Sequence, residues 1–253
     1  MKGYKGIEGK VIFITGGNAG IGKATALAFA EEGAKIAIAA RRQKEGDETV
    51  EEIRKNGGEA IFIKMDVREQ NQVEAAINKT VETYGVLNFA FNNAGILNPL
   101  GPIEELSREI WDDSIATNLT GVWLCMKYEI PHMLKIGGGV IVNHSSIHGL
   151  ISNANGVSPY DASKHGVIGI TKSAAMENAK RGIRVNVIAT GDIRTPMMAT
   201  LGDKFAEMIR ARHPIGRSGT MEEVAQTVLF LCSDGASFMT GSTVVIDGGL
   251  TAT

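Results

Sequence analysis

This sequence has few cysteines, few prolines and no long apolar run. No stretch approaches the ~20 consecutive apolar residues that a membrane-spanning helix requires. The opening MKGYKGIEGK lacks the apolar segment of a signal peptide. The 26 basic and 28 acidic side chains are interspersed, which argues against a nucleic-acid stripe or a polybasic membrane patch. We therefore expect a cytoplasmic protein with a small-molecule partner, and no nucleic-acid or membrane partner.

The rarity of cysteine and proline also bears on domain organisation. The two cysteines, Cys125 and Cys232, fall in apolar helix-like segments, which predicts reduced core side chains. The six prolines form no hinge, and no block of charge divides the chain. The 31 glycines are aperiodic and mostly fall where a strand-like run meets a helix-like run, which excludes a collagen-like or disordered chain. The sequence predicts a single domain over residues 1–253.

Short β-branched runs alternate with longer amphipathic ones along the chain. The strand-like runs are almost continuously apolar, which indicates burial on both faces and hence a mostly parallel sheet. Seven strands are expected, over 10–16, 35–40, 60–67, 86–95, 139–146, 183–189 and 242–247. Helices are expected over 21–32, 43–56 and 110–134, and around 203–212 and 221–232. Another is expected between the third strand and residue 84, and a further one begins at residue 158. The sequence predicts an α/β, doubly wound, Rossmann-like parallel sheet with helices on both faces, and chemistry just after the strands.

A glycine-rich turn, TGGNAGIG, follows the first expected strand. The backbone N–H groups of such a turn, with the positive end of the next helix, bind a pyrophosphate. The spacing is G-x-x-x-G-x-G rather than G-x-G-x-x-G, and an ordinary tight turn is the alternative. Its place at the head of a βα series favours a dinucleotide. The expected contacts are Gly16, Asn18, Ala19, Gly20, Ile21 and Gly22.

The tip of the second expected strand reads Ala39-Ala40-Arg41-Arg42. A chain that binds NAD usually carries Asp or Glu there, to accept hydrogen bonds from the ribose hydroxyls. Two guanidinium groups instead suit a 2′-phosphate. A solvated basic start to the next helix is the alternative. We predict NADP as the cofactor, with NAD less favoured.

The stretch SPYDASKHG, after the fifth expected strand, places a tyrosine and a lysine one helical turn apart. Ser158 as N-cap, Pro159 at the first helical position and Asp161 in a capping-box-like place predict a helix start. Tyr160 and Lys164 then share one face, where a surface pair is the alternative. A lysine charge ~4 Å from the phenol at a dielectric near 20 is worth ~4 kcal/mol, or ~3 pKa units. The pair therefore predicts acid–base catalysis by tyrosine.

Polar residues also end the third, fourth and fifth expected strands. Taken alone, each of these ends is ordinary turn chemistry. Their joint order and spacing resemble the short-chain dehydrogenase/reductase family, in its single-domain branch of about 250 residues, over essentially the whole chain. The residues that carry the resemblance are Thr15–Gly22, Asp66, Asn92–Gly95, Asn118, Ser146, Tyr160, Lys164 and Asp247–Gly249.

The resemblance implies a role for each catalytic residue. Tyr160 would exchange a proton with the substrate oxygen, and Lys164 would lower the tyrosine pKa and bind the nicotinamide ribose. Ser146, three residues before Gly149 in the S-x-x-G pattern, would orient and polarise the carbonyl. Asn118 would support a water relay from the lysine to solvent. Hydride would pass directly between nicotinamide C4 and the substrate carbon, so no metal is expected.

The resemblance also completes the cofactor site and implies a homotetramer. Where the family reads Pro-Gly after the sixth strand, this chain reads Thr190-Gly191, which frees φ at 190 and returns an N–H donor. The helices at 110–134 and 160–178 would pair across subunits, and the C-terminal strand would help form a second interface. The remaining expected cofactor contacts are Arg41, Arg42, Asp66, Val67, Asn93, Ala94, Gly95, Tyr160, Lys164, Gly191, Ile193 and Thr195.

The same residues argue against other functions than an NADP-dependent oxidoreductase. A serine hydrolase would use Ser145 or Ser146 with His148, but the chain has no G-x-S-x-G elbow. A histidine metal site is disfavoured because His144 and His148 lie at a strand end and in a loop. A non-catalytic NADP-binding sensor would not need the four catalytic residues together. The expected substrate is a moderately apolar ketone or secondary alcohol, contacting Ile96, Leu97, Ile147, His148, Leu150, Asn153, Asn155, Met197, Met198 and Leu201.

Overall fold

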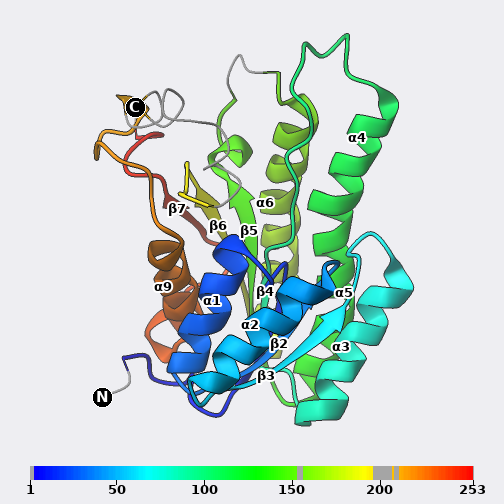
Figure 1. Ribbon diagram of the computed structural model, residues 1–253, viewed down its shortest axis with the longest axis vertical. Coiled ribbons are helices and arrows are strands. Elements are labelled where there is room, and N and C mark those ends of the chain that lie inside the picture. The colour runs from blue at the N-terminus through cyan, green and yellow to red at the C-terminus, as the bar shows by residue number, and fades with distance from the viewer. Residues whose placement is uncertain (1–2, 153–155, 196–206, 208–210, 253) are drawn as a thin grey trace.

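The computed structural model describes residues 3–152, 156–195, 207 and 211–252. Within these ranges one sheet runs through the molecule and carries helices on both faces (Figure 1). The expected pocket residues Asn153, Asn155, Met197, Met198 and Leu201, and most of the expected helix at 203–212, lie outside the described residues.

Seven parallel strands form the sheet, in the order β3-β2-β1-β4-β5-β6-β7. This confirms the predicted doubly wound α/β architecture. The chain changes direction across the sheet between β1 and β4, so their carboxyl ends border the crevice where such folds bind ligands. The strands are β1 Val11–Thr15, β2 Lys35–Ala40, β3 Glu59–Lys64, β4 Phe89–Asn92, β5 Gly139–Ser146, β6 Ile183–Thr190 and β7 Thr243–Ile246.

The helices divide between the two faces of the sheet, and each face has its own apolar cluster. One cluster joins β1 residues such as Ile12 to α1, α2 and α9, and the other joins Phe13 to α3, α5 and α6. The alternation along β1 explains why its whole length is apolar. The helices are α1 Gly20–Glu31, α2 Gln43–Lys55, α3 Gln70–Tyr84, α4 Arg108–Ile115, α5 Gly121–Lys135, α6 Ser158–Asn178 and α9 Met221–Cys232.

The expected single helix over 110–134 is wrong in one respect. Helices α4 and α5 are joined by a π-helical turn, Ala116–Thr120, which contains Asn118. A π turn widens the helix locally, and such turns are frequent at functional sites. Apolar periodicity does not report it, because one widened turn leaves the buried face almost unchanged.

The expected cap of the tyrosine-bearing helix is also wrong. Helix α6 includes Ser158, its N-cap is Val157, and no side chain of the described residues caps it. Asp161 does not form a capping box because its carboxylate accepts hydrogen bonds from the side chains of His148 and Ser152. A tertiary partner therefore replaces the local one.

Two further expectations concern the core and the membrane. Cys125 and Cys232 are buried free thiols, as predicted. Across the described ranges, no helix is both long and apolar enough to cross a bilayer.

Candidate functional site

The glycine-rich turn lies at the carboxyl end of β1 and leads into α1. A Cβ on Gly16, whose φ is 67°, would lie 2.9 Å from Asn93 Nδ2, and a Cβ on Gly22 would lie 2.3 Å from the Gly16 carbonyl oxygen. Only glycine therefore allows α1 to pack this closely on the turn. Among the described residues no side chain caps α1 at Ala19 and none in its first turn is acidic. The first N–H groups of α1 are thus available to an anion.

Asn18 gives an independent indication of a ligand at this turn. Its amide nitrogen Nδ2 is buried and has no hydrogen-bond partner among the described residues. An unpartnered buried donor costs free energy, so its retention points to an acceptor from outside the chain. Thr195 lies opposite, with its Cγ2 3.9 Å from the position of a Cβ on Gly20. The residues present therefore fit a dinucleotide phosphate held between the turn and the loop after β6.

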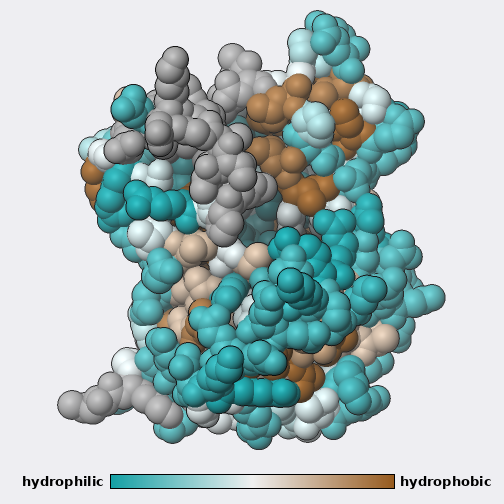
Figure 2. Space-filling view, viewed as in Figure 1, coloured by the Kyte–Doolittle hydropathy of each residue, from teal (hydrophilic) through white to brown (hydrophobic). Residues whose placement is uncertain are grey.

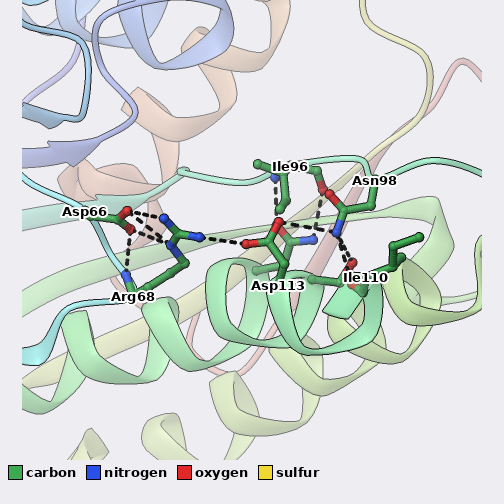
Figure 3. A network of polar contacts seen from close by, with 8 residues as sticks. Asp66, Arg68, Ile96, Asn98, Ile110 and Asp113 are labelled. Atoms are coloured by element: carbon green, nitrogen blue, oxygen red, sulfur yellow. Dashed lines mark hydrogen bonds and ion pairs between the residues drawn. The ribbon is translucent and has the colours of Figure 1, made fainter. Parts of the chain in front are cut away.

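Asp66 lies in the loop just after β3. The guanidinium of Arg68 donates to its carboxylate through Nε at 3.1 Å and Nη2 at 2.6 Å (Figure 3). These hydrogen bonds lower the pKa of Asp66, burial opposes them, and the charge of Arg41 adds to the lowering. Arg41 therefore lies within electrostatic reach of this aspartate. Arg42 instead pairs with Glu45 at 3.1 Å.

Arg68, which sequence analysis missed, also connects the loop after β3 to α4. Its Nη1 donates to Asp113 on α4 at 2.8 Å (Figure 3). From the loop after β4, Asn98 Nδ2 donates to the carbonyl of Ile110 at 3.1 Å and to the Ser114 hydroxyl at 3.0 Å. The only sequence signal was a basic residue two positions after Asp66, an expected cofactor contact.

Tyr160 and Lys164 lie on one face of α6, as predicted. The amino group of Lys164 is 5.4 Å from the centroid of the tyrosine ring and donates to the carbonyl of His144 at 2.9 Å. Burial lowers the pKa of Lys164 to about 8. A charged lysine therefore stands beside the phenol at neutral pH.

The expected low pKa of the tyrosine is wrong for this arrangement. Burial raises the pKa of Tyr160 to about 12, a hydrogen bond with Ser146 lowers it, and the charges of Asp161 and Asp192 raise it further. Desolvation of the phenolate thus outweighs the local attraction that the i,i+4 spacing suggested. The phenol is protonated at neutral pH and is a proton donor there.

Ser146 lies at the end of β5, within hydrogen-bonding reach of that phenol. Its hydroxyl also accepts from the His148 N–H at 3.2 Å and donates to the Thr190 carbonyl at 3.4 Å. The neighbouring Ser145 hydroxyl donates to the Lys164 carbonyl at 2.9 Å, which is a structural contact. A Cβ on Gly149 would lie 2.7 Å from that same carbonyl, so the S-x-x-G turn requires glycine to pack on α6.

His148 packs against Tyr160. Sequence analysis predicted His148 only as a residue of the substrate pocket. Its ring meets the Tyr160 ring edge-on, with centroids 5.7 Å apart. Its Nδ1 lies 2.6 Å from the Asp161 carboxylate. The side chain is thereby fixed beside the proposed reaction centre. The signal was present in SPYDASKHG, but Asp161 was interpreted as a cap.

The last residue of β4, Asn92, and the residue that follows it, Asn93, make different contacts. Asn92 is buried and donates to Glu129 at 3.1 Å and to Asn143 at 3.0 Å, below the crevice. Burial raises the pKa of Glu129 to about 8. Asn93 instead faces the glycine turn, donating to the carbonyl of Thr15 at 3.0 Å.

Asn118 joins the π turn to the loop after β4. Its Oδ1 accepts from the Ile96 N–H at 2.8 Å and its Nδ2 donates to the Ile96 carbonyl at 2.9 Å. A Cβ on Gly95 would lie 3.2 Å from Asn118 Oδ1 and 3.6 Å from Lys164 Nζ. The structure therefore brings Gly95, Asn118 and Lys164 together. The water relay predicted for Asn118 stays a prediction.

The loop after β6 closes the other side of the crevice. Gly191 donates to the Ile246 carbonyl on β7 at 2.9 Å, and Ile193 forms an isolated parallel bridge with Gly219. In the loop after β3, the side chain of Val67 is buried, and a Cβ on Gly121 would lie 2.9 Å from its Cβ. The cofactor contact expected for Val67 stays a prediction.

A cavity with room for little more than a water molecule adjoins Tyr160. Apolar surface gathers at the same end of the molecule, at the upper right of Figure 2, and the loop after β4 contributes exposed Leu97, Leu100 and Ile103. Within the described ranges no group of three or more His, Cys, Asp or Glu residues is placed to hold a metal ion. The cavity is lined by Leu97, Asn98, Pro99, Leu100, Ile110, Ser114, Gly156, Val157, Pro159 and Tyr160.

Comparison with known proteins gives full-length matches. The protein-family model described as enoyl-(acyl carrier protein) reductase matches residues 16–251. Cyclohexanol dehydrogenase of Acinetobacter sp. strain SE19 is 47% identical, over 96% of this chain and 95% of that protein. The 3-oxoacyl-acyl-carrier-protein reductase FabG of Thermotoga maritima is 44% identical, over 96% and 98%. The crystal structure of a short-chain type dehydrogenase/reductase from Mycobacterium marinum superposes with a TM-score of 0.94, at 37% identity over 98% and 97%.

Proposed function

Because this chain belongs to the short-chain dehydrogenase/reductase family, we propose that it interconverts a cyclic secondary alcohol and its ketone with NADP(H). Membership makes the protein an NAD(P)-dependent oxidoreductase of alcohols or carbonyl compounds. The observation that carries the proposed chemistry is that Tyr160 lies beside both Ser146 and Lys164, and that Lys164 in turn lies beside Gly95, at the crevice where the glycine turn lies.

The residues act on the substrate oxygen as follows in the direction of reduction. The Tyr160 hydroxyl donates a proton to the carbonyl oxygen, and the Ser146 hydroxyl holds that oxygen and polarises the carbonyl. The ammonium of Lys164, anchored on the His144 carbonyl, stabilises the phenolate that forms. When bound, the nicotinamide supplies the hydride, or accepts it in the reverse direction.

The proposed substrate class rests on two observations. Leu97 and Leu100, which share a water-sized cavity with Tyr160, expose about half of their surface and offer an aliphatic face to a saturated ring. The cyclohexanol dehydrogenase is among the most similar relatives at 47% identity. A panel containing cyclohexanone, cyclohexanol and a 3-oxoacyl thioester, followed by nicotinamide absorbance with both cofactors, tests it. Turnover of the thioester alone would contradict the cyclic substrate, and binding of NADPH without any turnover would favour a sensor.

NADPH should be preferred over NADH by roughly one to two orders of magnitude in kcat/KM. Arg41 is exposed at the end of β2 and lies within reach of Asp66, whereas Arg42 is held by Glu45. Arg41 is therefore the better candidate to hold a 2′-phosphate by charge-assisted hydrogen bonds. The double variant Ala40→Asp/Arg41→Ile should reverse the preference, because the new carboxylate repels the 2′-phosphate and the arginine that would bind it is gone.

The matched control for this prediction is Arg42→Ala, which removes a neighbouring charge that already has a partner. It should change the NADPH-to-NADH ratio far less than Arg41→Ala. Wild-type kcat/KM with NADH equal to or above that with NADPH would contradict the assignment of Arg41.

The proposed assembly is a homotetramer. Exposed apolar side chains lie on the helices and the strand expected at its interfaces, among them Trp111 on α4, Trp123 on α5, Met176 on α6 and Val245 on β7. Covering them would remove apolar surface from water. Light scattering at micromolar concentration should give about four times the mass of one chain. The mass of a single chain would show that these faces stay exposed.

A further inference from the structure

A backbone carbonyl on β1 and side chains from the ends of the three neighbouring strands form one chain of hydrogen bonds across the carboxyl edge of the sheet. Asn93, just after β4, donates from Nδ2 to the Thr15 carbonyl on β1 at 3.0 Å. Asn93 Oδ1 lies 3.0 Å from Nδ1 of His144 on β5. His144 Nε2 lies 3.1 Å from the hydroxyl of Thr190 at the end of β6. The order of these strands in the sheet is β1-β4-β5-β6, so each link spans one strand spacing.

The direction of every bond in this chain follows from its first link. Because the Thr15 carbonyl can only accept, the nitrogen of the Asn93 amide faces it and the oxygen faces His144. That oxygen can only accept, so Nδ1 carries the imidazole proton and Nε2 is an acceptor. The Thr190 hydroxyl is then the donor to Nε2. Burial lowers the pKa of His144 to about 3, so the ring stays neutral in this single tautomer.

The His144–Thr190 pair also touches both proposed catalytic groups through its backbone. The His144 carbonyl accepts from the amino group of Lys164 at 2.9 Å. The Thr190 carbonyl accepts from the Ser146 hydroxyl at 3.4 Å. The His144 ring is held on its other side by stacking on Phe91, with centroids 5.9 Å apart. Displacing either member would therefore move an anchor of Lys164 or Ser146.

We propose that His144 and Thr190 act together as a positioning pair, an inference that rests on the proposed function. Their side-chain hydrogen bond sets where Lys164 and Ser146 stand and where the loop after β6 begins. Without the Thr190 hydroxyl, His144 Nε2 would lose the donor that the structure gives it.

The test is a double-mutant cycle on the full chain. Thr190→Val keeps the shape of the side chain but removes the donor. It should lower kcat for ketone reduction about tenfold, through misplacement of the reacting groups. It should also lower the Tm by about 3–8 °C, because the imidazole acceptor is left unpaired. Thr190→Ser, which keeps the hydroxyl, should restore both values to near those of the wild type.

The second variant, His144→Asn, keeps an N–H toward Asn93 but removes the acceptor toward Thr190. In the His144→Asn background, Thr190→Val should cost less than about twofold in kcat, since its partner is already gone. The dissociation constant of NADPH, measured by fluorescence, should change far less than kcat. A residue that served only stability would lower the Tm and leave kcat per folded active site unchanged.

The cycle distinguishes this proposal from the proposed function. Equal effects of Thr190→Val in the wild-type and His144→Asn backgrounds, in both kcat and Tm, would overturn the pair while leaving the oxidoreductase in place. If the wild type turned over no ketone or alcohol, the proposed function would fail, and the catalytic role of the pair with it. If the two substitutions were coupled in their effect on the Tm but not on kcat, the hydrogen bond would be purely structural, and the positioning role would also be overturned.

Discussion

The Tyr160→Phe substitution is expected to lower kcat by about 10³–10⁴-fold, because it removes the only group proposed to transfer a proton to the substrate oxygen. The ring itself remains, so its contacts with His148 and the Lys164 amino group are kept. The fold and the glycine turn are not touched by the change. NADPH should bind with nearly its wild-type dissociation constant, and thermal unfolding should show an intact protein.

The raised pKa of the tyrosine gives this prediction a pH signature. A phenol with a pKa of about 12 is almost fully protonated at neutral pH, and its phenolate fraction grows as pH rises. Alcohol oxidation, which needs the phenolate as base, should therefore speed up from neutral to alkaline pH. Ketone reduction, which needs the phenol as acid, should not. If Tyr160→Phe keeps wild-type turnover and the same pH dependence, another group supplies the proton.

Ser146→Ala has the second largest expected effect, a loss of about 10²–10³ in kcat. Its hydroxyl lies within reach of the Tyr160 phenol and is the group proposed to hold the substrate oxygen as charge develops. A group that acts mainly in the transition state affects kcat more than cofactor binding. Steady-state kinetics together with NADPH binding separates the two.

Ser145→Ala is the matched control, since it removes the hydroxyl of the adjacent serine. That hydroxyl donates to the Lys164 carbonyl, so its loss should lower the Tm with a much smaller loss of kcat. The opposite ranking of the two variants would transfer the catalytic role to Ser145.

The architecture could be predicted because its determinants are local. The apolar runs of β1 and β2 are long enough to show burial on both faces, and each is followed by an amphipathic helix. The right-handed βα connection then leaves few possible topologies. The pairing of Tyr160 with Lys164 was likewise a matter of helical spacing.

What could not be predicted depends on contacts between segments far apart in the sequence. The tyrosine pKa is set by burial, which only the assembled crevice determines. Asp161 has a suitable position for a helix cap, but His148 from the preceding loop takes its carboxylate. The partner of Thr190 was invisible because His144 lies 46 positions away and becomes a neighbour only when β5 pairs with β6.

The most direct test of the account follows the hydride itself. Cyclohexanone is incubated with the wild-type protein and NADPH that carries deuterium at the transferred C4 position, and the product is examined by mass spectrometry. Direct transfer predicts cyclohexanol with one deuterium at the carbinol carbon, formed by the wild type and about 10³–10⁴-fold more slowly by Tyr160→Phe. Product without deuterium, or labelled product at equal rates from both proteins, would contradict an oxidoreductase in which Tyr160 supplies the proton.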